Sequence, residues 1–306
     1  MKLVRIEEDA RFYYVVIGEE LLPFDIIVPA DQRLMMPMHA EEYLPALTVM
    51  LSRGDLVQRQ HSRLLTAAPD QFKPFRRSTS QVVLAAPVNP GSIREVVNPF
   101  KCDASKGATP LYQYINVGSI ASPIHPVELP SFARAVVPKI QVAAVVGSPG
   151  TNILLEEADQ YIAGYTIITT LIEPVLRNEE AGAGMGPGKS SDFASLAGPI
   201  LITADELVQV YSETSSSGTT LHMTTRLSLN GGEPHEYIFQ IPWTFAQILS
   251  YASTGSNLFA GDMFTVQVVP DSAIVELLGQ NGDFLQSGDE LCVEVVGIGE
   301  HTVAIK

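Results

Sequence analysis

Apolar residues along most of the chain fall in short runs bounded by Gly, Pro, Asn or Asp. One such run, "KIQVAAVVG" (residues 139–147), has the length and composition of a buried strand. The predicted strands lie at residues 11–18, 24–30, 81–87, 139–147, 164–172, 198–203, 221–232, 261–270, 274–279 and 289–306. This density of strands and turn residues predicts a largely β domain, a sandwich, barrel or roll, rather than alternating βαβ units.

Three segments interrupt the strands with helical patterns. "LEEADQYIAGY" (residues 155–165) predicts a helix that ends at Gly164, since glycine tolerates the left-handed conformation of a helix C-cap. "PWTFAQILSYAS" (residues 242–253) has apolar residues at helical spacing. Thr203 and Glu206 fit a capping box, which predicts a third, short helix after residue 203.

The first 80 residues differ from the rest. Strand-like runs are followed by an amphipathic, helix-like stretch at residues 41–65 and then by a basic, turn-rich stretch at residues 70–81. We therefore expect a small α+β domain over residues 1–80, a linker near residues 70–85, and a mostly β domain over residues 81–306. The fold class is α+β, mostly β.

Composition and charge exclude several partners. The 306 residues include 46% apolar residues and carry a formal net charge of −15, whereas nucleic-acid affinity comes mainly from basic residues. No apolar run reaches the roughly 20 residues that span a bilayer, and the first residues turn acidic where a signal peptide would turn apolar. We expect no nucleic-acid or membrane partner and a cytoplasmic location.

Sulfur and imidazole side chains give little sign of a metal or disulfide site. Cys102 and Cys292 are too few for a disulfide framework and lack the paired spacing of a zinc site. The six histidines are scattered, and "MMPMH" (residues 35–39) is typical of packing residues rather than of a soft-metal site. No Gly-x-Ser-x-Gly elbow occurs, so serine-based acyl transfer has no positive support.

The glycine-rich stretch "AGAGMGPGKS" (residues 181–190) ends like a phosphate-binding loop. That motif requires a glycine five residues before Gly188, where this chain has Ala183, and a strand in front of it. We therefore predict a mobile loop rather than a nucleotide site, with Lys189 as a residue that reaches a ligand.

Several segments, taken in order, resemble the fumarylacetoacetate hydrolase superfamily over residues 82–306. The motifs that carry the resemblance are "GSIRE", "YINVGSIASP", "KIQVAAVVG", "ADQYIAGYTIITT", "GKSSDFASLAGPILITADEL", "LNGG", "ILSYAS", "LFAGDM" and "SGDELCVEVVGIG". The resemblance implies a β-roll around a divalent cation, usually magnesium, that polarises a β-dicarbonyl or 2-oxo acid. The small N-terminal domain also fits members of this length.

The resemblance also implies positions for the cation's carboxylate ligands. They fall on Glu95, Lys139, Gln141 and Thr170, so that one carboxylate in four is kept. Lys139 and Gln141 lie two residues apart, on one face of the predicted strand. A cation there would meet an ammonium group, and unit charges about 4 Å apart repel by about 4 kcal/mol at an effective dielectric of 20. We therefore expect no metal and no cofactor at these positions.

Other positions implied by the resemblance have changed as well. The water-activating His falls on Cys102 and an Arg falls near Pro174, whereas Lys189 is kept. Gln267–Val269 replace a small polar turn that binds substrate, and Glu276 falls near the acid that pairs with the catalytic His. Tyr165, in the Gly-Tyr-Thr motif, is a candidate for substrate contact together with Glu95, Gln141 and Thr170.

Three functions follow from these residues. The first is a metal-independent enzyme that makes, breaks or rearranges bonds next to a carbonyl, in a specialised biosynthetic pathway, with Lys139, Lys189, Cys102 and Glu276 as catalytic candidates. In it, Lys139 replaces the cation's charge and, with Lys189, holds an enolate or carboxylate below a lid that carries Cys102. The second is a non-catalytic partner of an active homologue, in which Lys139 pairs with Glu95 and fills the space. The third is a metal hydrolase with relocated ligands such as Glu173 or Asp192. In each case we expect a homodimer that binds a small molecule.

Overall fold

The computed structural model describes residues 1–9, 13–24, 73–101, 108–122, 124–215, 217–279 and 284–306. The predicted helix at residues 41–65, the "MMPMH" segment, most of the strand at residues 24–30 and Cys102 lie outside these ranges. Among the described residues no helix has both the length and the apolar character needed to cross a membrane.

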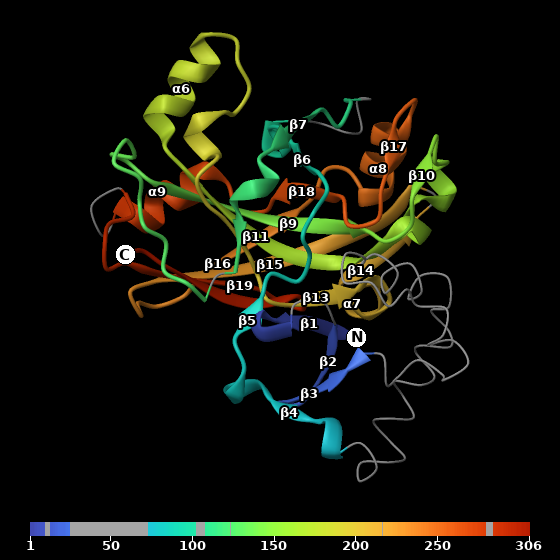
Figure 1. Cartoon of the computed structure of the whole chain (residues 1–306). Coiled ribbons are helices and arrows are strands. Elements are labelled where there is room, and N and C mark those ends of the chain that lie inside the picture. The colour runs from blue at the N-terminus through green and yellow to red at the C-terminus, as the bar shows by residue number, and fades with distance from the viewer. Residues whose placement is uncertain (10–12, 25–72, 102–107, 123, 216, 280–283) are drawn as a thin grey trace.

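Most of the described strands form one large, mixed sheet (Figure 1). Its neighbours run in the order β4-β3-β2-β1-β13-β11-β9-β18-β6-β7, with β5, β8 and β12 paired beside this path. The bounds are β1 Lys2–Ile6, β2 Tyr14–Ile17, β3 Glu20–Pro23, β4 Arg77–Ser78, β5 Leu84–Ala85, β6 Ile93–Val96, β7 Tyr112–Ile115, β8 Ile120–Ala121, β9 Val137–Val146, β11 Ile162–Ile172, β12 Ser195–Ala197, β13 Leu201–Thr203 and β18 Met263–Gln267.

A second sheet packs against the first. It has the order β14-β15-β19-β20, and β16 pairs with β15. Its strands are β14 Ser212–Ser215, β15 Gly218–Leu229, β16 His235–Gln240, β19 Glu290–Val295 and β20 Gly299–Ala304; a separate short pair joins β10 Gly150–Thr151 to β17 Asn257–Leu258. Val142 of β9, Ile167 of β11, Leu227 of β15 and Val293 of β19 belong to one buried apolar cluster, so the main core lies between the two sheets.

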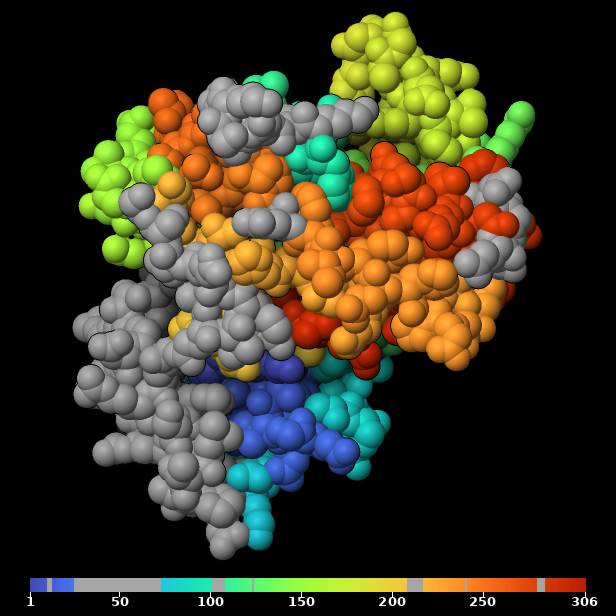
Figure 2. Space-filling view, turned by 180° about the vertical axis from the view of Figure 1, so that it is seen from behind, coloured from blue at the N-terminus to red at the C-terminus, as the bar shows by residue number. Residues whose placement is uncertain are grey.

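Four α-helices occur in the described part of the second half of the chain: α6 Pro174–Gly182, α7 Ala204–Tyr211, α8 Phe245–Ser253 and α9 Asp271–Gly279. Figures 1 and 2 show α6 and the loop after it standing out from the body. The 3-10 helices are η1 Glu7–Asp9, η2 Lys73–Phe75, η3 Thr79–Gln81, η4 Pro99–Lys101, η6 Val117–Ser119, η7 Leu155–Tyr161 and η8 Lys189–Ser191.

Helix α8 confirms the prediction from "PWTFAQILSYAS". Thr244 caps it, and its hydroxyl accepts a hydrogen bond from the Gln247 amide while the Gln247 side chain accepts one from the Thr244 amide. Such a reciprocal pair satisfies two of the amide groups that a helix start leaves free.

Three local predictions were wrong. Residues 274–279, predicted as a strand, form part of α9, because Ile274, Leu277 and Leu278 bury one face at helical spacing. Gly164 does not cap a helix: η7 ends at Tyr161, and Gly164 lies inside β11. The capping box before α7 is also absent, since Thr203 and Glu206 contact the Met1 amino group, but the short third helix that it predicted is present as α7.

The described N-terminal strands continue the large sheet. Strand β1 pairs antiparallel with β13, and Lys2 lies opposite Ile202. In Figure 1 these strands, in blue, lie at one end of the sheet, away from α6. The fold therefore leaves the other end of the sheet, around β9, β18 and β6, for the residues described next.

Candidate active site

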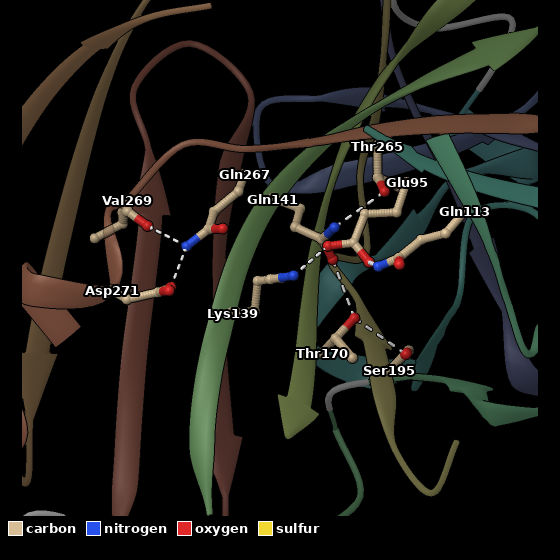
Figure 3. Close-up of polar contacts among 10 residues, drawn as sticks. All are labelled: Glu95, Gln113, Lys139, Gln141, Thr170, Ser195, Thr265, Gln267, Val269 and Asp271. Atoms are coloured by element: carbon tan, nitrogen blue, oxygen red, sulfur yellow. Dashed lines mark hydrogen bonds and ion pairs between the residues drawn. The ribbon is translucent and has the colours of Figure 1, made fainter. Parts of the chain in front are cut away.

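One face of the large sheet changes from apolar to polar along its strands. Side chains alternate between the two faces of a strand, so Lys139, Gln141, Ala143 and Val145 of β9 share a face. Ala143 and Val145 pack in an apolar cluster with Met263. Beyond them, the same face carries Lys139, Gln141 and their polar neighbours, which form the candidate site (Figure 3).

An ion pair between Lys139 and Glu95 lies at the centre of this site. The Lys139 ammonium contacts Glu95 Oε1, and Gln113 Nε2 donates to Glu95 Oε2 over 2.9 Å. The Glu95 side chain is 4% exposed and that of Lys139 is 18% exposed. Strands β6, β7 and β9 thus hold the Glu95 carboxylate with both oxygens occupied, while the partly exposed ammonium has three N–H groups and uses one of them on Glu95.

A second polar group extends from Gln141 across the sheet. Gln141 Nε2 donates to Thr265 Oγ1 over 3.0 Å, and Thr170 Oγ1 donates to Gln141 Oε1 over 3.0 Å. Thr170 also contacts the hydroxyl of Ser195 at 3.2 Å, which in turn lies 3.2 Å from that of Ser119. Register explains the grouping, because Thr170 pairs with Ser195 on one side and with Lys139 on the other.

Gln267 closes the site on the other side. It lies opposite Gln141 in the β18–β9 register, so the two side chains share a face. Its Nε2 donates to Val269 O and to Asp271 Oδ1, both at 2.7 Å. Asp271 is the first residue of α9, and the Gln267 amide therefore ties the end of β18 to the start of that helix (Figure 3).

Lys189 lies on η8 and points toward solvent. Its ammonium is 3.1 Å from Asp192 Oδ1 and 5.1 Å from the centre of the Phe132 ring, and its side chain is 61% exposed. The segment before it is anchored by Glu180, whose carboxylate accepts hydrogen bonds from Gly188 N, Ser190 N and Ser190 Oγ. Burial opposes ionisation of this carboxyl, but the hydrogen bonds from Ser190 and Gly188 outweigh it and lower its pKa.

Four candidate residues from the sequence meet in the described structure: Glu95, Lys139, Gln141 and Thr170. Tyr165 lies on the opposite face of β11 from Thr170, buried with its ring 5.4 Å from that of Phe245. Burial, with a smaller effect of Asp159, raises the pKa of Tyr165 well above its ordinary value, so its hydroxyl stays protonated.

The other two catalytic candidates stand apart from this group or are not described. Glu276 is exposed on α9, where its charge contributes, after burial, to raising the pKa of Tyr237. Cys102 falls in the undescribed residues 102–107.

Five residues of the site were not predicted from the sequence: Gln113, Ser119, Ser195, Thr265 and Asp271. Gln113, Ser195 and Asp271 reach it from β7, β12 and the start of α9, which are far from β9 along the chain. Strand pairing brings Gln113 and Ser195 there, the start of α9 brings Asp271, and no local pattern marks them.

Comparison with known proteins places the chain in a family. A model described as fumarylacetoacetate (FAA) hydrolase C-terminal matches residues 90–306. The chain belongs to the fumarylacetoacetate hydrolase family. Membership confirms the expected fold class, a mostly β domain that follows a smaller N-terminal region.

The similarity to relatives in the family covers only part of this chain and part of each relative. The mitochondrial oxaloacetate tautomerase of Xenopus laevis is 25% identical over 181 residues, 59% of this chain and 53% of that protein. The fumarylacetoacetate hydrolase domain-containing protein 2 homolog of Dictyostelium discoideum is 24% identical over 228 residues, which are 71% of this chain and 72% of that protein. The chain thus spans about half the length of the first of these.

Solved structures of the family share the fold over the whole chain. The fumarylacetoacetate hydrolase of Exiguobacterium antarcticum has a TM-score of 0.69 at 19% identity and covers 100% of this chain and 99% of its own. The maleylpyruvate hydrolase of Sphingobium sp. SYK-6 has a TM-score of 0.66 at 17% identity and covers 100% and 99%. At this identity the likeness establishes the fold alone.

Proposed function

We propose that this family member is an enzyme that acts next to a carbonyl group of an oxo acid or β-dicarbonyl compound without a divalent cation at Glu95. The observation that carries the proposal is the ion pair of Lys139 with Glu95, at the positions that the family resemblance gives to a metal and its ligands. The names of two similar proteins, an oxaloacetate tautomerase and a maleylpyruvate hydrolase, support the substrate class.

The residues present do not fit a magnesium ion. Mg²⁺ prefers carboxylate and water oxygens in octahedral geometry. Here the four positions offer one carboxylate, one ammonium, one amide and one hydroxyl, and both Glu95 oxygens already accept hydrogen bonds from Lys139 and Gln113. The relocated ligands suggested by the sequence are also engaged, because Glu173 Oε2 accepts a hydrogen bond from Leu176 N and Asp192 pairs with Lys189.

Lys139 supplies a positive charge to the reacting group instead. When a base, either solvent or the Cys102 thiolate of the sequence hypothesis, takes a proton from the carbon beside a carbonyl, negative charge develops on the carbonyl oxygen, and a fixed ammonium stabilises that charge. Glu95 and Gln113 hold Lys139 in place, and its other N–H groups donate to the substrate oxygen. Lys189 can bind a carboxylate of the same substrate, since an exposed ion pair such as that with Asp192 contributes only about 0–1 kcal/mol.

A test of activity uses oxaloacetate in the presence of EDTA. We expect faster loss of the enol form, followed by ultraviolet absorbance, than in buffer alone. Lys139→Met should remove most of the acceleration and Lys189→Met part of it, whereas Lys73→Met, an exposed lysine of η2, should leave it unchanged. Acceleration that survives Lys139→Met would contradict the proposal, and Cys102→Ala separately tests the thiol.

Metal independence gives a second test. The melting temperature should change by less than about 1 °C with millimolar Mg²⁺ or EDTA, because a ligand stabilises the folded state only if it binds it. A rise of several degrees with Mg²⁺ that EDTA reverses would favour a metal hydrolase with relocated ligands.

The same ion pair favours a second candidate, a non-catalytic partner of an active homologue. Lys139 and Glu95 cancel each other's charge, so the site is satisfied without a substrate. Binding of oxaloacetate without any acceleration of its tautomerisation would support this candidate over the enzyme.

A further inference from the structure

The orientation of the Gln267 amide decides which ligand groups this part of the site accepts. Both partners of its nitrogen, Val269 O and Asp271 Oδ1, can only accept hydrogen bonds. The nitrogen must therefore face them, and a flipped amide would place two acceptors against a third. Both N–H groups of Gln267 are used, so its oxygen is the part of the amide that still has no partner among the described residues.

The neighbouring carboxylate of Asp271 favours the same kind of ligand group, a hydrogen-bond donor. Asp271 lies beside the Gln267 amide, and Figure 3 shows the pair on one side of Lys139, with Glu95 on the other. A ligand group here meets an amide oxygen and a carboxylate. A second carboxylate on the ligand would face acceptors and like charge, which costs binding free energy, whereas an amide N–H or a hydroxyl would find an acceptor.

We infer that the ligand carries one anionic or carbonyl oxygen toward Lys139 and a neutral hydrogen-bond donor toward Gln267 and Asp271. The preferred substrate class is therefore a monoanionic oxo acid with an amide or hydroxyl group at its far end, and a dicarboxylate such as oxaloacetate binds more weakly. Gln267 and Asp271 are the specificity-determining residues. The inference rests on the proposed function, since it assumes an oxo-acid ligand at Lys139.

A matched pair of probes tests it. In 2-oxosuccinamate a neutral amide replaces the C4 carboxylate of oxaloacetate, so the two compounds differ in charge and donor capacity but hardly in shape. Isothermal titration calorimetry with EDTA present should give at least about tenfold tighter binding of 2-oxosuccinamate to the wild-type chain, because the oxaloacetate carboxylate would lack a donor there.

Two variants locate the effect. Asp271→Asn should bring the two affinities within about threefold, because it removes the repelling charge. Gln267→Met keeps the side-chain volume but loses the amide oxygen, and should also reduce the preference. Glu290→Gln, an equal loss of charge at the exposed start of β19, should leave the preference unchanged. A thermal melt of each variant checks that it folds.

The outcomes separate this inference from the proposed function. Equal or tighter binding of oxaloacetate by the wild-type chain would overturn the inference and leave the proposed function standing. A preference for the amide that persists in both folded variants would also overturn it. Binding of neither compound would overturn the proposed function and the inference together.

Discussion

Lys139 and Glu95 depend on each other because their charges are buried together. Removing one member leaves an uncompensated charge, which costs about 3–5 kcal/mol of stability, whereas replacing both by apolar side chains of similar size is often close to neutral. We therefore expect Lys139→Met to lower the free energy of unfolding by about 3 kcal/mol and Glu95→Leu with Lys139→Met to recover most of it. Urea unfolding of the single and double variants measures this, and a double variant as unstable as the single one would contradict it.

His301 couples stability to pH. It is 6% exposed on β20, its Nε2 lies 2.9 Å from Thr169 Oγ1, and burial lowers its pKa to about 4. An unfolded histidine has a pKa of about 6.5, so between these values the unfolded chain binds a proton that the folded chain does not. The contribution of His301 to stability is therefore lost as the pH falls from about 6.5 to about 4, at about 1.4 kcal/mol per pH unit.

The pH dependence of unfolding in His301→Gln checks this prediction. In that variant the free energy of unfolding should change with pH less steeply than in the wild type, by about 1.4 kcal/mol per pH unit between about pH 4 and 6.5. The variant His125→Gln, at an exposed histidine, should keep the wild-type slope. Identical slopes in all three chains would show that unfolding does not change the protonation of His301, which would contradict this prediction.

The sequence predicted part of the site because side chains alternate with period two along a strand. This rule places Lys139 and Gln141 on one face from their spacing alone, and the family resemblance adds Glu95 and Thr170. Gln113, Ser195 and Asp271 could not be found in this way, since strand register and the start of α9 bring them in. Tyr165 lies on the opposite face of the same strand from Thr170, because the two residues are an odd number of positions apart.

At the scale of elements, the contact between β11 and β13 depends on Gly164. A Cβ atom there would lie 2.2 Å from the Ile202 carbonyl oxygen, which is backbone and cannot swing away. We expect Gly164→Ala to destabilise the fold by at least about 2 kcal/mol. Gly182→Ala, at the end of α6 with no atom within 4 Å of the added carbon, serves as control and should be neutral or slightly stabilising. Equal melting temperatures for both variants would contradict this account.

The same glycine shows why some elements escaped prediction. Glycine at the end of a helix-like pattern fits a C-cap, but here a neighbouring backbone requires it, and that neighbour lies about 40 residues further along the chain. Residues 274–279 show a second limit, since a short apolar run fits either a strand or one face of a buried helix. Longer runs such as β9, β11, β15 and β19 were predicted because they are apolar, rich in β-branched residues and bounded by Gly, Pro, Asn or Asp.

At the scale of the whole molecule, apolar side chains remain on the surface of the single chain. Ile238 on β16 is 79% exposed and Val275 on α9 is 60% exposed. A homodimer that covers such side chains stays a prediction, and light scattering at micromolar concentration should give twice the mass of the chain. The mass of one chain would contradict it.

The pairing of β1 with β13 sets a waiting time during synthesis. Lys2 and Ile202 are neighbours in the sheet, although roughly 200 residues separate them along the chain. A ribosome adds about 5–20 residues per second, so β1 emerges about 10–40 s before its partner exists. Until then β1 can pair with β2 and β5, but its other partner, β13, does not yet exist. The first strands to be made are therefore among the last to be joined to the large sheet through β13.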